Sequence, residues 1–256
     1  EREINNYRKI SHPLICKYYG VLKEKNSNSI VMEYIDGKTL FEINELNLEV
    51  KDKISIVIEM LYVFKYLHDN NFIYRDLKPS DVIINRNNQI VLIDFDSMIE
   101  YDNFDVKDQE DEKDQKEHTL NWHPDFVDPS LENSVPTQEC DIYSIGKMVY
   151  FIFTGKIPIE ANEKKYVIEC PEMNSLYTKC ISKQNQEKKT ISKMIEFIKN
   201  QNKIKEHFSI YGNDYTTNLE CYFYLLTLLK QDNIEYIHSK LIENSKKVNK
   251  YIHYLI

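Results

Sequence analysis

The segment from Tyr74 to Asp96 constrains the chain more than any other. It begins with the loop Tyr74-Arg75-Asp76-Leu77-Lys78-Pro79-Ser80-Asp81 and continues as two short apolar runs, 82–84 and 89–93, separated by a polar turn. This pattern predicts a β-hairpin, and the two ends of a hairpin lie side by side. Asp81 and Asp94 are therefore expected close together. Paired carboxylates suit a divalent cation, and phosphoryl transfer needs such a site.

This segment resembles the catalytic loop and metal-binding motif of the protein kinases. The family pattern is His/Tyr-Arg-Asp-Leu-Lys-Pro-x-Asn, then a hairpin, then Asp-Phe-Gly. The resemblance implies that Asp76 orients the attacking hydroxyl and that Lys78 offsets charge on the transferred phosphoryl group. It also implies that Asp94 and Asp81 bind Mg²⁺. A Lys two residues after the Asp is typical of the Ser/Thr class.

Two positions depart from the family pattern. Asp81 stands where the family has Asn, and it can still ligate a hard cation while adding a negative charge. Asp96 stands where the family has Gly, a residue that tolerates left-handed backbone. A carboxylate at Asp96 is expected near the phosphates of ATP, where its repulsion would weaken nucleotide binding unless a metal screens it.

The residues before this segment resemble part of the small β lobe of a kinase. Residues 1–10 have helical periodicity and resemble helix C, and Glu3 falls where the family keeps a Glu that pairs with a strand Lys. Residues 17–22 and 29–35 are predicted as two strands. Met32 then matches the gatekeeper, and Glu33-Tyr34-Ile35 matches the hinge that binds the adenine of ATP. Residues 36–40 are expected to turn the chain into a mainly helical large lobe.

The large lobe is predicted to contain a helix over 52–69 and another from Cys140-Asp141 to Phe153. Asp141 has two compatible readings: it caps its helix, or, as the resemblance implies, it holds the backbone of the catalytic loop. Between these helices, residues 100–118 hold nine acidic residues against three lysines. Two readings stay open: most of this run forms a solvated, mobile loop, or its carboxylates neutralise Arg75. His123 replaces a family Thr, which implies an altered substrate-docking surface.

The resemblance therefore implies an α+β kinase-like domain over residues 1–200, and residues 201–256 are predicted as a helical C-terminal extension. The chain begins inside an expected helix and contains no Gly-x-Gly-x-x-Gly loop. We therefore expect the glycine loop and the strand Lys either upstream of Glu1 or lost. Two functions remain open. One is ATP- and Mg²⁺-dependent phosphoryl transfer to protein hydroxyls, and the other is a pseudokinase that binds or scaffolds a partner protein.

Composition narrows the expected surroundings. The formal net charge of −8 argues against a nucleic-acid binder, which needs an excess of Lys and Arg on one face. Because no apolar run approaches the length of a membrane span, we expect a cytoplasmic or nuclear protein without a membrane partner. The five widely spaced cysteines predict reduced thiols.

Overall fold

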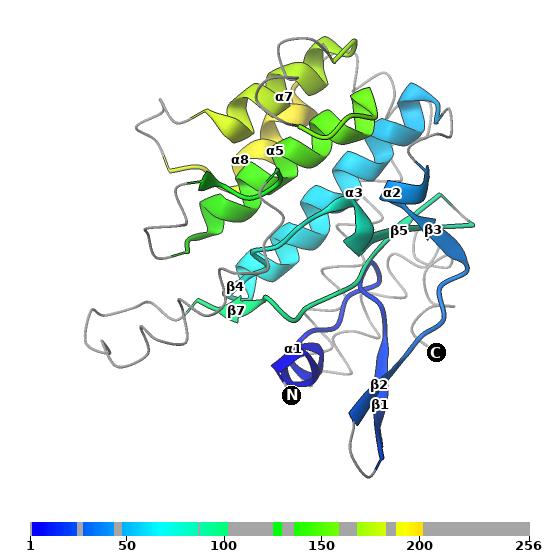
Figure 1. The fold of residues 1–256 in the computed structure, drawn as a ribbon. Coiled ribbons are helices and arrows are strands. Elements are labelled where there is room, and N and C mark those ends of the chain that lie inside the picture. Colours follow the sequence, from blue (N-terminus) through cyan, green and yellow to red (C-terminus); the bar gives the residue numbers. More distant parts are fainter. Residues whose placement is uncertain are drawn as a thin grey trace, which may run out of the picture. The chain divides into compact units, whose positions relative to one another are not determined.

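The computed structural model describes residues 2–24, 28–43, 48–86, 88–101, 125–129, 136–158, 168–182 and 188–201. The chain divides into two compact units, Glu1–Ile198 and Lys199–Ile256. Nearly all described residues belong to the first unit (Figure 1). The helices and small sheets of this unit confirm the predicted α+β class.

The helices and strands of this unit are labelled in Figure 1. The helices are α1 (Arg2–Lys9), α2 (Leu40–Ile43), α3 (Val50–Asp69), α5 (Gln138–Thr154), α7 (Pro171–Ile181) and α8 (Ile191–Lys199), with a 3₁₀ turn η1 (Pro79–Asp81). The strands are β1 (Tyr18–Lys23), β2 (Asn28–Met32), β3 (Gly37–Thr39), β4 (Phe72–Ile73), β5 (Val82–Asn85), β6 (Ile90–Leu92) and β7 (Ile99–Glu100).

The predicted hairpin is the antiparallel pair β5–β6, in which Val82 faces Leu92. A third strand, β3, extends this sheet on the other side of β5, where a turn was expected. At Gly37 of β3, an added Cβ would lie 2.2 Å from the carbonyl oxygen of Ile84, so only glycine fits at this approach. The short polar sequence of β3 carries no apolar alternation, which is why the sequence does not predict this strand.

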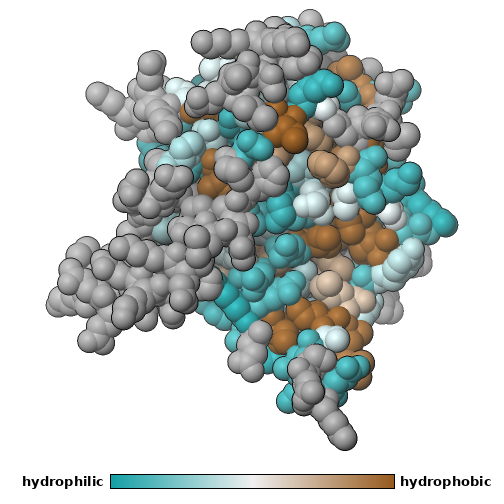
Figure 2. Space-filling model, viewed as in Figure 1, coloured by the Kyte–Doolittle hydropathy of each residue, from teal (hydrophilic) through white to brown (hydrophobic). Residues whose placement is uncertain are grey.

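The strands β1 and β2 form a separate two-stranded antiparallel sheet. The second of the two predicted strands ends at Met32, so the expectation that it continues to Ile35 is wrong. Large apolar side chains of this sheet are exposed, among them Tyr19, Leu22 and Val31. Hydrophobic residues accordingly reach the surface over this part of the molecule (Figure 2).

The helical part has its core where α3 packs against α5 and α5 packs against α7 (Figure 1). Helix α5 begins at the N-cap Thr137, whose side chain accepts a hydrogen bond from the Glu139 amide. Asp141 therefore does not cap this helix, because it lies one turn inside it. The helix ends at Gly155, whose φ of 67° provides the left-handed C-cap. Among the described helices, none combines the length and the apolar character that a membrane span requires.

Candidate active site

A buried carboxylate of α5 fixes the backbone of the loop that follows β4. Asp141 is 0% exposed, and its carboxylate accepts hydrogen bonds from the amides of Tyr74 (3.0 Å) and Arg75 (2.8 Å). The Nε2 atom of His68, at the end of α3, lies 2.8 Å from the same carboxylate. Arg75 has a φ of 80°, a conformation that persists in a non-glycine residue only when its surroundings impose it. Asp141 thus anchors the first turn of the loop to the helical core.

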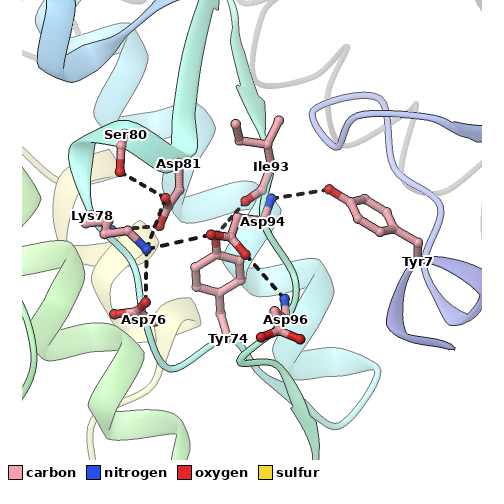
Figure 3. A network of polar contacts seen from close by, with 9 residues as sticks. All are labelled: Tyr7, Tyr74, Asp76, Lys78, Ser80, Asp81, Ile93, Asp94 and Asp96. Carbon is pink, nitrogen blue, oxygen red and sulfur yellow. Dashed lines mark hydrogen bonds and ion pairs between the residues drawn. The ribbon is translucent and has the colours of Figure 1, made fainter. Parts of the chain in front are cut away.

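The ammonium group of Lys78 lies among three carboxylates (Figure 3). Its Nζ atom is 2.9 Å from Asp76 Oδ2, 3.3 Å from Asp81 Oδ1 and 3.7 Å from Asp94 Oδ2. Burial alone would lower the pKa of Lys78, but the carboxylates outweigh burial and the net shift is upward. Lys78 therefore stays a cation. The structure brings together all four residues that the sequence places in the catalytic and metal-binding roles.

Asp81 is the most buried carboxylate of this group, with 2% of its surface exposed. It accepts hydrogen bonds from the Lys78 amide (3.2 Å) and the Ser80 hydroxyl (3.1 Å). Burial raises the pKa of Asp81, Lys78 opposes the rise, and the charges of Asp94 and Asp76 add to it, so that the pKa reaches about 7. The extra charge that Asp brings to this family position is therefore reduced near neutral pH.

Asp94, which follows the hairpin, has a left-handed backbone with a φ of 62°. Its side chain is 47% exposed. Asp96 is also exposed, and its amide donates to Asp94 Oδ1 over 3.4 Å. Asp96 is not among the residues with positive φ, so its backbone does not need the conformational freedom of the family Gly. The left-handed residue of this segment is Asp94.

The donors of this group suit Mg²⁺ when phosphate oxygens complete the shell. The described residues contain no group of three or more His, Cys, Asp or Glu side chains that could hold a metal ion by itself. Mg²⁺ is usually bound through one or two carboxylates together with waters and substrate phosphates. Asp81 and Asp94, which both approach the Lys78 ammonium, are the pair that would hold it. When bound, the ion would neutralise charge on the phosphates.

Glu3 lies close to this acidic end of the site. Its side chain is half-buried in α1, and burial raises its pKa, with further upward contributions from the charges of Asp94 and Asp96. Within the described residues, no ion pair of Glu3 is formed. The pairing of Glu3 with a strand Lys stays a prediction.

The expected adenine-binding residues occupy the last position of β2 and the segment that follows it. Met32 and Tyr34 are exposed, Tyr34 to 87%, while Glu33 and Ile35 are half-buried. The Glu33 amide donates to the Lys17 carbonyl over 2.8 Å, and the Glu33 carbonyl accepts from the Cys16 thiol over 3.4 Å. These contacts fix the segment against the chain just before β1. Nucleotide binding by its backbone stays a prediction.

Two further expectations concern residues that the structure does not describe. His123 and residues 102–118 of the acidic run lie outside the described ranges. Arg75, the expected partner of that run, is buried. Burial and the neighbouring charge of Arg2 lower the pKa of Arg75. Asp141 opposes this shift, but the net direction is downward. The proposed neutralisation of Arg75 by the acidic run therefore stays a prediction.

The sequence does not reveal the polar contacts that helix α1 makes with this site. The hydroxyl of Tyr7 accepts a hydrogen bond from the Asp94 amide over 3.2 Å, although the two residues are 87 positions apart. Asn6 donates to the carbonyls of Phe95 and Met98. The only sequence signal was the apolar face of α1, which contains Tyr7. Every residue has a backbone amide or carbonyl, so the sequence does not show which backbone groups Tyr7 and Asn6 contact.

Comparison with known proteins decides the family. The family model of the protein kinase domain matches residues 1–242, which is most of the chain. The chain belongs to the protein kinase domain family. The loop that Asp141 anchors, the Lys78 group and the hairpin are therefore parts of a kinase-like fold. The match extends past the boundary expected near residue 200, and that boundary stays a prediction.

Relatives named as kinases support this assignment at low identity. The chain is 28% identical over 220 residues to the "Putative serine/threonine-protein kinase" of Acanthamoeba polyphaga mimivirus. The matched region covers 75% of this chain and 76% of the viral protein. It is 28% identical to cAMP-dependent protein kinase type 3 of Saccharomyces cerevisiae, over 58% of this chain and 35% of that kinase. It is 32% identical to developmentally-regulated protein kinase 1 of Dictyostelium discoideum, over 65% of this chain and 22% of that protein. The chain thus spans well under half the length of the two cellular kinases.

Proposed function

We propose that the protein transfers the terminal phosphoryl group of ATP to serine or threonine hydroxyls of proteins. The observation that carries this proposal is the grouping of Asp76 and Asp94 around the Lys78 ammonium, where Asp76 and Lys78 lie on a loop that a buried carboxylate anchors. Phosphoryl transfer depends on positioning and on electrostatic stabilisation, and a rigid loop supplies both. The family and the names of the relatives agree with this activity.

Each residue has a task in this proposal. Asp76 accepts a hydrogen bond from the attacking hydroxyl and orients it toward the phosphoryl group. Lys78, whose cationic form the carboxylates stabilise, offsets the charge of the transferred group. Asp94 and Asp81 would hold Mg²⁺, which supplies charge neutralisation between the phosphates when it is bound.

A pseudokinase is the second candidate, and one feature of the site favours it. Asp81, Asp96 and Glu3 add carboxyl groups around Asp94. Burial, and after it the charges of Asp94 and Asp96, raises the pKa of Glu3, and burial together with the charges of Asp94 and Asp76 raises the pKa of Asp81 against the effect of Lys78. Excess negative charge opposes the binding of phosphates. In this case the protein would bind a partner protein through a kinase-like fold without transferring a phosphoryl group.

Transfer from γ-labelled ATP to a generic protein substrate separates the two functions. The full-length protein is compared with its Asp76→Asn variant and with Asp69→Asn, a control that removes an exposed carboxylate paired with Lys65 on the surface of α3. We expect Asp76→Asn to lower the rate at least about 100-fold, since a positioned general base contributes about 10²–10⁴, and Asp69→Asn to retain it. Equal background transfer in all three proteins would contradict kinase activity and support the pseudokinase.

A further inference from the structure

A side chain of helix α3 bonds the outer edge of strand β6. Strand β6 lies at one end of the sheet β3-β5-β6, and a strand in that position presents backbone groups that need partners from outside the sheet. The Ile90 amide donates a hydrogen bond to Glu59 Oε2 over 2.8 Å, and the Leu92 amide donates to the Leu14 carbonyl over 2.7 Å. Glu59 thus takes the place of a backbone acceptor at the first residue of β6.

The hydrogen bond between Glu59 and Ile90 is shielded from water. Glu59 is 1% exposed, and Ile90 is 0% exposed. A buried amide that loses its acceptor finds no water to replace it, so the loss is costly. Burial raises the pKa of Glu59 to about 8, and the Ile90 amide opposes the rise. The carboxyl group is therefore mostly protonated near neutral pH, and a neutral acceptor joins α3 to β6.

The other end of β6 is bonded to the loop of the candidate site. After β6, the chain continues as Ile93 and Asp94, which form the hairpin exit. The Ile93 amide donates to the Asp81 carbonyl over 2.9 Å, and the Tyr74 hydroxyl donates to the Ile93 carbonyl over 2.6 Å (Figure 3). Because β6 has only three residues, a displacement at Ile90 reaches the hairpin exit within one short strand.

Helix α3 therefore supports the candidate site at two points. At its C-terminal end, His68 contacts Asp141, the carboxylate that anchors the loop. Nearer the middle of the helix, Glu59 holds the start of β6. One helix thus supports both the loop that carries Lys78 and the hairpin that leads to Asp94. The separation between the Lys78 ammonium and the Asp94 carboxylate, 3.7 Å in this structure, depends on both contacts.

We propose that Glu59 is a positioning residue that sets the distance between the Asp94 carboxylate and the loop that carries Lys78 and Asp81. This inference rests on the proposed function, because it assigns the purpose of this distance to the binding of a metal–nucleotide complex. Glu59 touches neither the metal nor the nucleotide in this proposal, and acts through the Ile90 amide and strand β6. A side-chain acceptor of the same length can fill this role, and an apolar side chain cannot.

Four forms of the full-length protein test this proposal near neutral pH: the wild type, Glu59→Gln, Glu59→Leu and Leu176→Ala. Gln keeps an oxygen that can accept from the Ile90 amide and matches the neutral carboxyl group in size. Leu fills a similar volume without an acceptor. Leu176→Ala removes a fully buried side chain from α7 and is the control for a general loss of stability.

Amide hydrogen exchange, measured without nucleotide, tests the contact itself. In Glu59→Leu, exchange in the segment 90–94 is expected to speed up by at least about fivefold relative to exchange in α5, because one hydrogen bond is lost at this segment. In Glu59→Gln, this ratio is expected to stay within about twofold of the wild type. In Leu176→Ala, both segments are expected to speed up together. An unchanged ratio in Glu59→Leu would overturn the proposal.

Isothermal titration with a non-hydrolysable ATP analogue tests the effect on the site. The factor by which Mg²⁺ strengthens binding is expected to fall roughly threefold to tenfold in Glu59→Leu, and to keep its wild-type value in Glu59→Gln and Leu176→Ala. A purely structural role of Glu59 would leave this factor unchanged. Equal factors in Glu59→Leu and Leu176→Ala would therefore overturn the proposal, and so would an equal loss in Glu59→Gln and Glu59→Leu.

Two further variants keep the outcome decisive. If circular dichroism shows that Glu59→Leu does not fold, Glu59→Asp, which draws the carboxyl group back by one methylene group, replaces it with the same expected results. Asp94→Asn separates this inference from the proposed function. If Asp94→Asn keeps the full effect of Mg²⁺, the metal role of Asp94 is wrong, and the positioning claim is overturned with it. If Asp94→Asn loses the effect and Glu59→Leu keeps it, only the role of Glu59 is overturned.

Discussion

The two sheets that carry the expected ends of the nucleotide site differ in how the chain supports them. In the sheet β3-β5-β6, Asp81 immediately precedes β5 and Asp94 follows β6, and the strand residues Val82 and Leu92 are fully buried. The sheet β1–β2, which ends at Met32 and leads to Tyr34, has two strands among the described residues and exposes large apolar side chains. A two-stranded sheet is marginally stable by itself. We therefore propose that the expected phosphate end is preorganised by buried contacts, whereas no residue of β1 or β2, which lead to the expected adenine end, is buried.

This difference has a consequence for function. Catalytic geometry depends on side chains that their neighbours hold in place. The side chains of Asp141, Asp81, Asn6 and Tyr7 make polar contacts with the backbone of the loop and the hairpin exit. Substitutions near this end should therefore lower the stability of the whole unit, and substitutions in β1–β2 should not.

The largest effect is expected at Asp141. Asp141→Ala leaves the Tyr74 and Arg75 amides buried without their acceptor and removes the charge that faces His68. Loss of this buried carboxylate and its hydrogen bonds is expected to lower the free energy of unfolding by about 3–5 kcal/mol. Denaturation in urea measures the change. Asp69→Ala, on the exposed end of α3, is the matched control with an expected change below about 1 kcal/mol. Similar losses in both variants would break the comparison.

A smaller effect is expected where β3 joins β5. Gly37→Ala would place a Cβ within contact of the Ile84 carbonyl, so the strands must separate. We expect a loss of about 2–3 kcal/mol, in the range typical of overpacking. Lys38→Ala changes the neighbouring exposed residue of the same strand and serves as the control. Thermal denaturation measures the free energy of unfolding of both variants. A difference below about 0.5 kcal/mol between Gly37→Ala and Lys38→Ala would show that the pairing of β3 contributes little to stability.

The same substitution in each sheet compares them directly. Val82 in β5 is 0% exposed, and Val31 in β2 is 43% exposed. Val82→Ala removes buried methyl groups and is expected to cost about 2 kcal/mol. Val31→Ala is expected to change stability by less than about 0.5 kcal/mol. Urea midpoints of the two variants, measured side by side, give the difference. Equal costs would mean that β1–β2 is as well supported as the other sheet.

The last expected effect is a change with pH, which near neutral pH is small. Glu59 is buried in α3 and accepts a hydrogen bond from the Ile90 amide, which ties α3 to β6. Burial raises the pKa of Glu59 to about 8, and the Ile90 amide opposes the rise. The folded state therefore holds a proton that the unfolded state loses above its ordinary pKa, so stability falls as pH rises from about 5 to 8. Glu59→Gln should remove this part of the fall.

The free energy of unfolding of Glu59→Gln, relative to that of the wild type, is expected to rise by about 1 kcal/mol between pH 7 and pH 8. Unfolding free energies of both proteins across pH 5 to 9 measure it. Parallel curves for the two proteins would show that Glu59 does not titrate between its folded and unfolded pKa values as proposed.

The sequence predicted those features that local patterns encode. The hairpin, the helices α3 and α5, and the joint placement of Asp76, Lys78, Asp81 and Asp94 followed from apolar periodicity and from an ordered motif. The strand β3 could not be predicted, because its pairing with β5 depends on a close backbone approach at Gly37. The capping role considered for Asp141 was wrong, since Thr137 begins the helix four positions earlier.

The contacts of α1 could not be predicted for a different reason. Tyr7 and Asn6 bind backbone groups of a segment about 90 residues away, and any residue at positions 94–98 offers the same groups. The family Gly at position 96 does not indicate which residue of this segment is left-handed, and Asp94 is the residue that adopts positive φ. The tyrosine hydroxyls and the turn after β6 decide this, and both depend on tertiary contacts.

The effect of Mg²⁺ on nucleotide binding is the most direct test of a preorganised phosphate end. Isothermal titration measures the affinity of the full-length protein for a non-hydrolysable ATP analogue with and without Mg²⁺, in the wild type and in Asp94→Asn. We predict that Mg²⁺ strengthens binding by at least about tenfold, equivalent to about 1.4 kcal/mol, and that Asp94→Asn loses this gain. Binding of equal strength with and without Mg²⁺ in the wild type would contradict a preorganised metal and phosphate site at Asp81 and Asp94.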